Sequence, residues 1–131
     1  MKKKILYLED KDTVVKIVCA YLSEYEVYCF ENPLKALSWL EEGNIPDLIL
    51  SDLNMPEMNG KDFLFYIKSR DVYEKIPFVI LSGESNSSIR IELLQQGAED
   101  FISKPFNPVE LKVRVDKYLK TSTQDVAKNG Y

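Results

Sequence analysis

The 131-residue sequence predicts an α/β fold in which a doubly wound five-stranded parallel sheet is covered by five helices. Two observations support this prediction. Short apolar runs alternate along the chain with segments whose apolar residues recur at helical spacing. The connections between successive runs are long enough for the crossovers that parallel strands require. With 45% hydrophobic and 29% charged residues, the chain has the composition of a globular protein and the size of one domain.

The amino-terminal part of the chain contains two strand–helix units. The first is a strand over Ile5–Leu8 and a helix that begins at Asp12. The apolar residues of this helix follow helical spacing: Val14, Val18, Tyr21 and Leu22. The second unit is a strand over Val27–Phe30 and a helix with Pro33 at a first helical position and Gly43 after its end. Its apolar residues are Leu34, Leu37 and Leu40.

Two further strands are predicted in the middle of the chain. The third strand, Leu48–Ser51, ends directly before Asp52, and a turn-rich segment follows. Gly60 precedes the third helix. The apolar residues of that helix are Phe63, Leu64 and Ile67. Pro77 introduces the fourth strand, Phe78–Leu81.

The carboxyl-terminal part completes the repeat. Ser85 and Ser87 are suitable caps for a fourth helix that ends at Gly97. Its apolar residues are Ile89, Leu93 and Leu94. A short strand over Asp100–Ile102 follows, and Pro108 opens the last helix. The inner face of that helix is predicted to be Leu111, Val115, Tyr118 and Leu119. We expect residues 1–120 to form the domain and residues 121–131, which lack clear apolar periodicity, to be a tail or the start of a linker.

Charge and composition exclude several functions. Seventeen Lys and Arg against 21 Asp and Glu give a net charge of −4, the wrong sign for a surface that binds nucleic acid. The apolar run after the basic first residues is too short for a signal peptide or a membrane span, so the expected location is the cytoplasm. Cys19 and Cys29 lie among apolar residues and are expected to be reduced core residues.

The sequence contains no histidine. Histidine is the usual general base of enzymes. It is also the side chain that carries a phosphoryl group in phosphohistidine. Any phosphoryl or acyl transfer by this chain must therefore take its base or its phosphoryl donor from another molecule.

Polar residues follow four of the predicted strands. Glu9 and Asp10 follow the first strand, Asp52 the third, Ser82 the fourth and Lys104 the fifth. The carboxyl ends of parallel strands meet at one edge of a sheet, where α/β proteins place their binding sites. Three carboxylates there repel one another unless a cation relieves the repulsion, and their oxygens suit Mg²⁺. A metal, a lysine and a hydroxyl around Asp52 would favour its reaction as a nucleophile with a phosphoryl group.

With these motifs in this order, the chain resembles the receiver domain of two-component response regulators over residues 3–120. The resemblance implies a flavodoxin-like fold with strand order 2-1-3-4-5. It implies that Asp52 accepts a phosphoryl group from a histidine kinase or phosphotransfer protein. It also implies that Asp10 and Asp52 bind Mg²⁺ or Mn²⁺ directly, with the backbone carbonyl of Asn54, and that Glu9 acts indirectly.

The same resemblance assigns switching roles. Lys104 would pair with the phosphoryl group and would be joined to Pro105 by a cis peptide bond. Ser82 would move toward the phosphoryl group and Phe101 would turn inward with it. Three positions depart from the commonest pattern: Glu9 replaces an aspartate, Ser82 lacks the methyl of threonine, and Phe101 lacks the hydroxyl of tyrosine.

Phosphorylation would then reshape the face formed by the fourth helix, the fifth strand and the fifth helix, which would bind an output partner or support a phosphorylation-dependent dimer. Candidate surface positions on it are Ile91, Gln95, Arg114 and Tyr118. The donor kinase would dock around the first helix and the edge that carries the site. The sequence is compatible both with a receiver that stands alone and with part of a longer regulator.

Two other classes of protein compete with this interpretation. Mg²⁺-dependent aspartyl-phosphate phosphatases also use an aspartate at a strand end, but they place a second aspartate two residues later as acid and base. Here that position is Asn54, which does not exchange a proton. An FMN-binding protein of the same fold needs a phosphate loop rich in Ser, Thr and Gly after the first strand, and Glu9 and Asp10 would repel that phosphate. Taken singly, Asp52 is as well explained as a turn residue, Glu9–Asp10, Ser82 and Lys104 are better explained as turns or surface loops, and Phe101 as a core residue. Their joint occurrence at four strand ends is what these interpretations do not explain.

Overall fold

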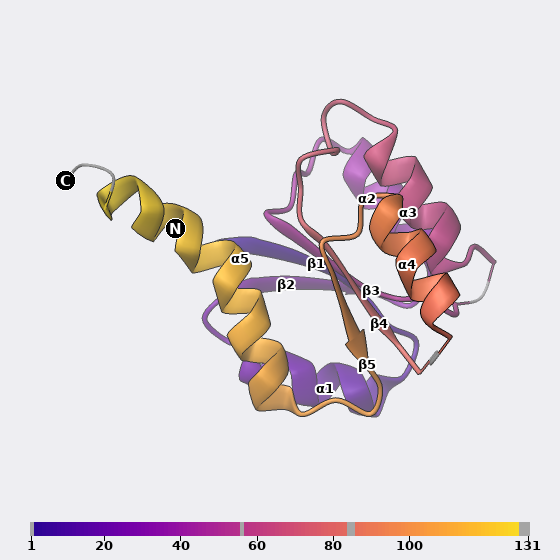
Figure 1. Ribbon diagram of the computed structural model, residues 1–131, viewed down its shortest axis with the longest axis horizontal. Helices are drawn as coiled ribbons and strands as arrows, with labels where there is room; N and C mark the ends of the chain where they lie inside the picture. Colours follow the sequence, from indigo (N-terminus) through magenta and orange to yellow (C-terminus); the bar gives the residue numbers. More distant parts are fainter. Residues whose placement is uncertain (1, 56, 84–85, 129–131) are drawn as a thin grey trace.

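The computed structural model describes residues 2–55, 57–83 and 86–128 (Figure 1). Strands and helices alternate along the chain, as predicted. The strands are β1 Lys4–Leu8, β2 Glu26–Phe30, β3 Leu48–Asp52, β4 Phe78–Ser82 and β5 Asp100–Ser103. The helices are α1 Asp12–Tyr21, α2 Pro33–Glu41, α3 Gly60–Lys68, α4 Ser87–Gln95 and α5 Pro108–Lys128.

The five strands form one parallel sheet in the order β2-β1-β3-β4-β5, which confirms the predicted flavodoxin-like topology. Every residue of β3 and β4 is buried, whereas the edge strand β2 is only partly buried. Continuous apolar strands of this kind are typical of a parallel sheet that helices cover on both faces.

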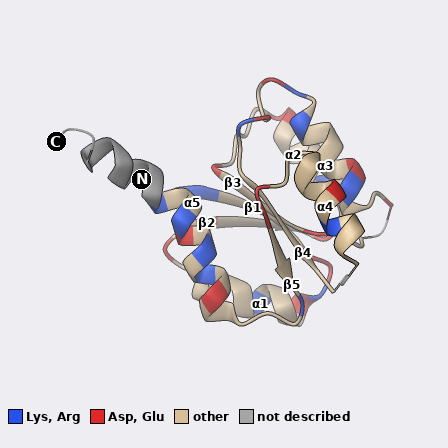
Figure 2. Ribbon diagram, in the orientation of Figure 1, with Lys and Arg blue, Asp and Glu red and all other residues tan. Residues whose placement is uncertain are grey.

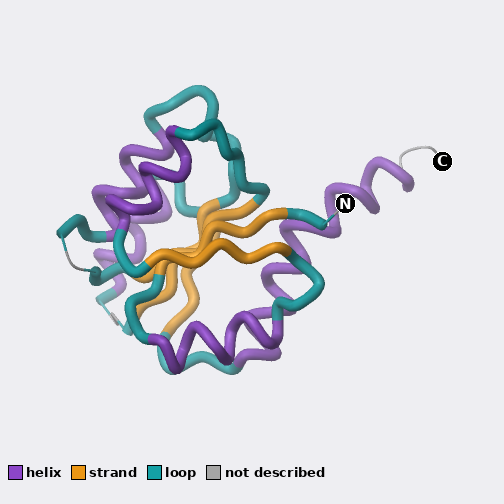
Figure 3. Tube along the Cα trace, turned by 180° about the vertical axis from the view of Figure 1, so that it is seen from behind, coloured by secondary structure: helices purple, strands orange, loops and turns teal. Residues whose placement is uncertain are grey.

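The helices form two layers (Figures 1 and 3). On one face, α1 and α5 pack on the sheet through a cluster that includes Val18 and Val115. On the other face, α2, α3 and α4 pack through Leu40, Phe63 and Leu93. Both clusters include side chains of the central strands, so the core continues through the sheet. No helix in the described part of the chain is both long and apolar enough to cross a membrane.

Asparagine side chains cap four of the helices. At α5, the Asn107 side chain accepts a hydrogen bond of 2.8 Å from the Val109 amide. Asn32, Asn59 and Asn86 accept hydrogen bonds from the backbone amides that begin α2, α3 and α4. The cap of α4 is therefore Asn86; Ser87 is the first helical residue, and Ser85 lies outside the described residues. Helix α1 begins at Asp12, as predicted, after a residue whose side chain makes no capping hydrogen bond.

Some of the apolar residues noted at helical spacing are exposed. Tyr21, Leu34 and Leu94 are each more than 40% exposed, although apolar residues at this spacing usually face the core. Each lies at the margin of its helix's apolar stripe, and the width of that stripe depends on how closely the helix approaches the sheet. Cys19 and Cys29 are free thiols but only partly buried, and burial raises the pKa of both.

The last helix is longer than the sequence pattern indicated. Helix α5 continues to Lys128, into the segment predicted to be a tail or linker. That segment contains no proline or glycine before Gly130, so nothing in its covalent structure ends the helix at residue 120. A functional boundary after residue 120 stays a prediction.

Candidate functional site

The strand-end residues meet at one edge of the sheet, because all five strands are parallel and in register. Asp52 is the last residue of β3 and is aligned with Leu81 of β4. Ser82 is the last residue of β4 and is aligned with Ser103 of β5. The backbone amide of Lys104 donates a hydrogen bond of 2.7 Å to the Ser82 carbonyl, which extends the ladder past β5. The sheet thus brings Lys104 to the same edge as Asp52.

Three carboxylates form a cluster at this edge. Glu9, Asp10 and Asp52 each offer an oxygen, and these oxygens lie within 4.8 Å of one another. Glu9 and Asp52 are 2% and 6% exposed, whereas Asp10 is exposed. Carboxylate oxygens at this spacing, with one ligand open to solvent, fit a hard divalent cation that keeps some of its water.

Lys104 lies against the two buried carboxylates. Its Nζ is 2.5 Å from Asp52 Oδ1 and 3.0 Å from Glu9 Oε1. Burial alone would lower the pKa of the lysine, but its hydrogen bonds and charge interactions with Asp52 and Glu9 outweigh that effect and raise the pKa. Lys104 therefore stays charged and offsets part of the negative charge of the cluster. The Lys104–Pro105 peptide bond is cis.

Asp52 is harder to ionise than an ordinary aspartate. Burial and the nearby charge of Glu9 raise its pKa to about 6, and Lys104 opposes them. A buried carboxylate beside one cation and a second carboxylate would gain from a further positive charge. The raised pKa of Asp52 is therefore consistent with a cation site at the cluster.

Backbone contacts hold the loop that follows Asp52. The Gly60 amide donates to the Leu53 carbonyl at 2.6 Å, and the Leu53 amide donates to the Leu81 carbonyl at 3.1 Å. Asn54, next along the chain, is exposed and lines a cavity of about 250 Å³ that also reaches Ile89 of α4. Gly60 appeared in the sequence only as a residue that precedes a helix, and its contact with the site could not be foreseen.

The two expected switch residues are both buried. Ser82 is 2% exposed at the end of β4, and Phe101 is 5% exposed within β5. The Phe101 ring packs in the core cluster beneath α4, and the guanidinium carbon of Arg90 lies 5.1 Å from the ring centroid. The contact of Arg90 with this ring was not apparent from the sequence, because α4 shows little amphipathic pattern.

Tyr7 is a second group that the sequence did not single out. Its side chain is fully buried in β1, and its hydroxyl has no hydrogen-bond partner among the described residues. Burial, and then the charge of Glu9, raise the pKa of this hydroxyl. Within an apolar strand, Tyr7 is indistinguishable by pattern from an ordinary core aromatic.

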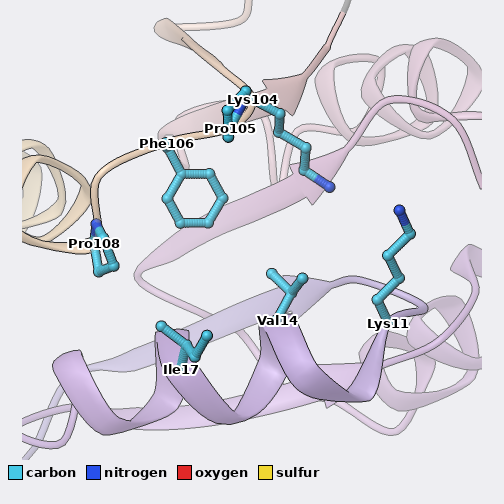
Figure 4. Close-up of a pocket in the computed structure, with 7 residues that line it drawn as sticks. All are labelled: Lys11, Val14, Ile17, Lys104, Pro105, Phe106 and Pro108. Atoms are coloured by element: carbon cyan, nitrogen blue, oxygen red, sulfur yellow. The ribbon is translucent and has the colours of Figure 1, made fainter.

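A groove lies beside the site, between α1 and the segment that joins β5 to α5 (Figure 4). Its volume is about 390 Å³. Val14 and Ile17 form its floor, opposite the ring of Phe106, and the side chains of Lys11 and Lys104 extend at one end. Because Lys104 contacts Asp52, this apolar groove opens beside the carboxylates.

Charged residues lie mainly on the helices and connecting segments, and apart from the start of β1 the strands carry few of them (Figure 2). Two carboxylates at the strand ends are buried: Glu9, directly after β1, and Asp52, at the end of β3. Glu9 is held there by two contacts: it accepts from the Lys11 amide at 3.3 Å and from Lys104. A charge buried with such partners is typical of a functional site.

Comparisons with known proteins agree with this geometry. Residues 5–116 match the family model of the response regulator receiver domain. The chain is 37% identical over 101 residues to the cyclic di-GMP phosphodiesterase response regulator RpfG of Xanthomonas campestris, covering 77% of this chain and 26% of RpfG. It is 32% identical over 122 residues to the phosphate regulon transcriptional regulatory protein PhoB of Escherichia coli, covering 92% of this chain and 53% of PhoB.

Solved structures show the same likeness. The signal receiver domain of a signal transduction histidine kinase from Syntrophus aciditrophicus matches with a TM-score of 0.82 at 32% identity, covering 91% of each chain. The chain therefore matches a receiver domain over nearly its whole length. By contrast, it spans only about half of PhoB and about a quarter of RpfG.

Proposed function

The chain belongs to the response regulator receiver family of two-component signal transduction, and we propose that it is a phosphorylation switch whose acceptor is Asp52. The observation that carries this proposal is the position of the Asp52 carboxylate. It is buried at the end of β3, within 4.8 Å of two other carboxylates and 2.5 Å from the Lys104 ammonium. Glu9 shares the cluster and the Lys104 contact, but of these two carboxylates only Asp52 belongs to a strand, as the last residue of β3.

Mg²⁺, or Mn²⁺ in its place, is the cofactor we propose for this cluster. Asp10 and Asp52 would bind it directly, Asn54 would contribute its backbone carbonyl, and Glu9 would act through water or hydrogen bonds. The fit rests on the hard oxygen donors and on the raised pKa of Asp52, which an added cation would relieve. When bound, such an ion neutralises charge that develops on the phosphoryl oxygens.

The transfer reaction follows from the residues present. One Asp52 carboxylate oxygen forms a bond to phosphorus as the phosphorus–nitrogen bond of a phosphohistidine breaks, and the imidazole leaves with the electron pair. The chain has no histidine, so the donor imidazole belongs to a histidine kinase or a phosphotransfer protein. Lys104 pairs with a phosphoryl oxygen of the product. The Asn54 side chain cannot act as acid or base, which favours a phosphoaspartate that persists as a signal over an enzyme that turns over.

The donor is proposed to dock on the groove beside the site. Its floor residues Val14 and Ile17, with Phe106 opposite, offer apolar contact next to Lys104. A partner helix that inserts apolar side chains there would bring its phosphohistidine to the edge that holds Asp52.

The output surface is proposed to be the face of α4, β5 and α5, reshaped when Ser82 and Phe101 respond to the phosphoryl group. Ile91 and Gln95 of α4 are exposed on the surface. Arg114 and Tyr118 of α5 are half-buried: Arg114 pairs with Asp100 at 2.9 Å, and the Tyr118 hydroxyl donates to the Glu99 carbonyl. This face would bind a partner protein, an attached output domain or a second copy of the chain.

The test is direct phosphorylation. The purified protein is incubated with Mg²⁺ and acetyl phosphate, and added phosphate is measured by intact-mass spectrometry. We expect one phosphate on the wild type and on Asp71→Asn, a change at an exposed carboxylate away from the cluster. We expect none on Asp52→Asn. Equal labelling of Asp52→Asn would rule out Asp52 as the acceptor.

A further inference from the structure

Arg90 of α4 lies over the aromatic ring of Phe101. Its guanidinium carbon is 5.1 Å from the ring centroid, within the range of a cation–π interaction. Phe101 is only 5% exposed, so the ring lies between the guanidinium and the core. With the described residues, Arg90 forms no salt bridge that would direct it elsewhere.

Few contacts anchor α4, so the Arg90–Phe101 contact matters for the position of this helix. Leu93 is the only fully buried residue of the helix within the described chain, and Ile89 is partly buried. On the side facing α3, Glu92 pairs with Lys61 at 2.9 Å, but both side chains are nearly half exposed and solvent weakens such pairs. The Arg90–Phe101 contact is therefore one of the few links between α4 and the buried structure.

Phe101 connects this contact to the site. It lies in β5, aligned with Ile80 of β4, and the next residues of the same strand and loop lead to Lys104. The phenylalanine ring has no hydroxyl, so no hydrogen bond can hold it in place. The negative face of the ring attracts a cation, and the Arg90 guanidinium lies over that face.

We propose that Arg90 is a positioning residue that holds Phe101 in its buried orientation and so links α4 to the phosphoacceptor site. This inference rests on the proposed switch function. If the buried orientation is part of the state that accepts the phosphoryl group, a cation on the ring raises the population of that state before any phosphate arrives. The arginine would then set both how readily Asp52 is phosphorylated and how strongly α4 responds.

The first experiment tests the contact without phosphorylation. A double-mutant cycle combines Arg90→Met, which keeps the apolar stem, with Phe101→Leu, and the unfolding equilibrium constant is measured in urea. We expect a coupling of about 2- to 5-fold between the two sites. We expect Arg90→Lys, which keeps the charge, to retain part of it. If the double variant changes the unfolding equilibrium constant by the product of the two single-variant factors, the residues are not coupled and the proposed contact is overturned.

The second experiment tests the role in switching. The rate of labelling by acetyl phosphate with Mg²⁺ is measured for the wild type, Arg90→Met and Arg90→Lys. Arg70→Met is the matched control, because Arg70 lies 4.3 Å from the Tyr66 ring centroid in a similar pair away from the site. We expect Arg90→Met to slow labelling about 2- to 5-fold, Arg90→Lys to restore part of the rate, and Arg70→Met to match the wild type.

Two failures are distinguishable. A wild-type protein that takes no label would overturn the phosphoacceptor function and, with it, the switching role of Arg90. A labelled wild type with an equal rate for Arg90→Met would overturn the role of Arg90 alone.

Discussion

Gly60 lies directly against the backbone of Asp52: a β-carbon at Gly60 would be 2.5 Å from the Asp52 carbonyl oxygen and 2.8 Å from the Leu53 α-carbon. Real β-carbons do not approach backbone atoms so closely. The first residue of α3 can therefore pack on the end of β3 only because it has no side chain. This contact holds the loop after Asp52 close to the sheet.

Gly60→Ala is expected to push α3 away from the end of β3. We expect a loss of about 1–3 kcal/mol in the free energy of unfolding, the usual cost of overpacking, and slower labelling of Asp52. Gly83→Ala is the matched control, because a β-carbon there meets nothing within 4 Å. Urea unfolding of both variants checks the prediction. Equal stability of the two would show that the loop adjusts without cost.

The pKa of Asp52 predicts how stability depends on pH. The pKa rises from 3.8 to about 6 on folding, so between these values the folded protein binds more protons than the unfolded chain. The contribution of Asp52 to stability therefore falls as the pH rises from about 4 to about 6, and it stays low above that. Asp52→Asn should remove this loss and be more stable than the wild type at pH 7.5 by up to about 3 kcal/mol. Its advantage should shrink toward pH 4. An advantage that is the same at pH 4.5 and pH 7.5 in urea unfolding would contradict the raised pKa.

Mg²⁺ is expected to stabilise the folded protein through the carboxylate cluster. A ligand that binds only the folded state at about 100 times its Kd adds about 2.7 kcal/mol. We expect Tm to rise with Mg²⁺ for the wild type and for Asp12→Asn, an exposed carboxylate outside the cluster, but not for Asp10→Asn. The affinity should also weaken as the pH falls below about 6, where protons compete for Asp52. Thermal unfolding and calorimetric titration at pH 5 and pH 7.5 measure both effects.

Ser82 is expected to transmit the phosphorylation signal without being needed to receive it. Ser82→Ala should still be labelled at Asp52, because the hydroxyl is not the nucleophile. It should lose the change in hydrogen exchange over Ser87–Gln95 that phosphorylation causes in the wild type. Ser82→Thr, which keeps the hydroxyl, should retain that change. If α4 responds equally in Ser82→Ala, Ser82 is not the switch residue.

The buried hydroxyl of Tyr7 is expected to cost stability, since it has no partner among the described residues. Tyr7→Phe removes the hydroxyl and leaves the ring, so we expect a gain of about 1 kcal/mol in the free energy of unfolding. Tyr25→Phe is the contrasting variant. Its hydroxyl donates to Asp116, and the change should be destabilising. Urea unfolding distinguishes the two, and a loss of stability in Tyr7→Phe would show that the hydroxyl is satisfied in solution.

The doubly wound parallel sheet could be predicted because alternating apolar runs and helical segments allow few other folds, and the resemblance to the receiver family supplied the strand order. The convergence of Glu9, Asp10, Asp52 and Lys104 followed from the same parallel order. The sequence could not predict which helix positions are buried, as Tyr21 and Leu94 illustrate, because burial depends on how helices approach the sheet. Nor could it predict the extension of α5 to Lys128, since the sequence after residue 120 lacks the apolar periodicity by which a helix is recognised.

By itself, the sequence indicated the family, with the strand order that the family implies, and the convergence of Glu9, Asp10, Asp52 and Lys104, because these depend on chain order and on residue type. Only the tertiary structure decided that Glu9 and Asp52 are buried while Asp10 faces solvent, and that the Lys104 ammonium contacts both buried carboxylates. It alone brought Arg90 over Phe101 and Gly60 against Asp52. The physical reason is that pKa values and contact distances arise from atoms far apart in the chain, whose packing no local pattern records.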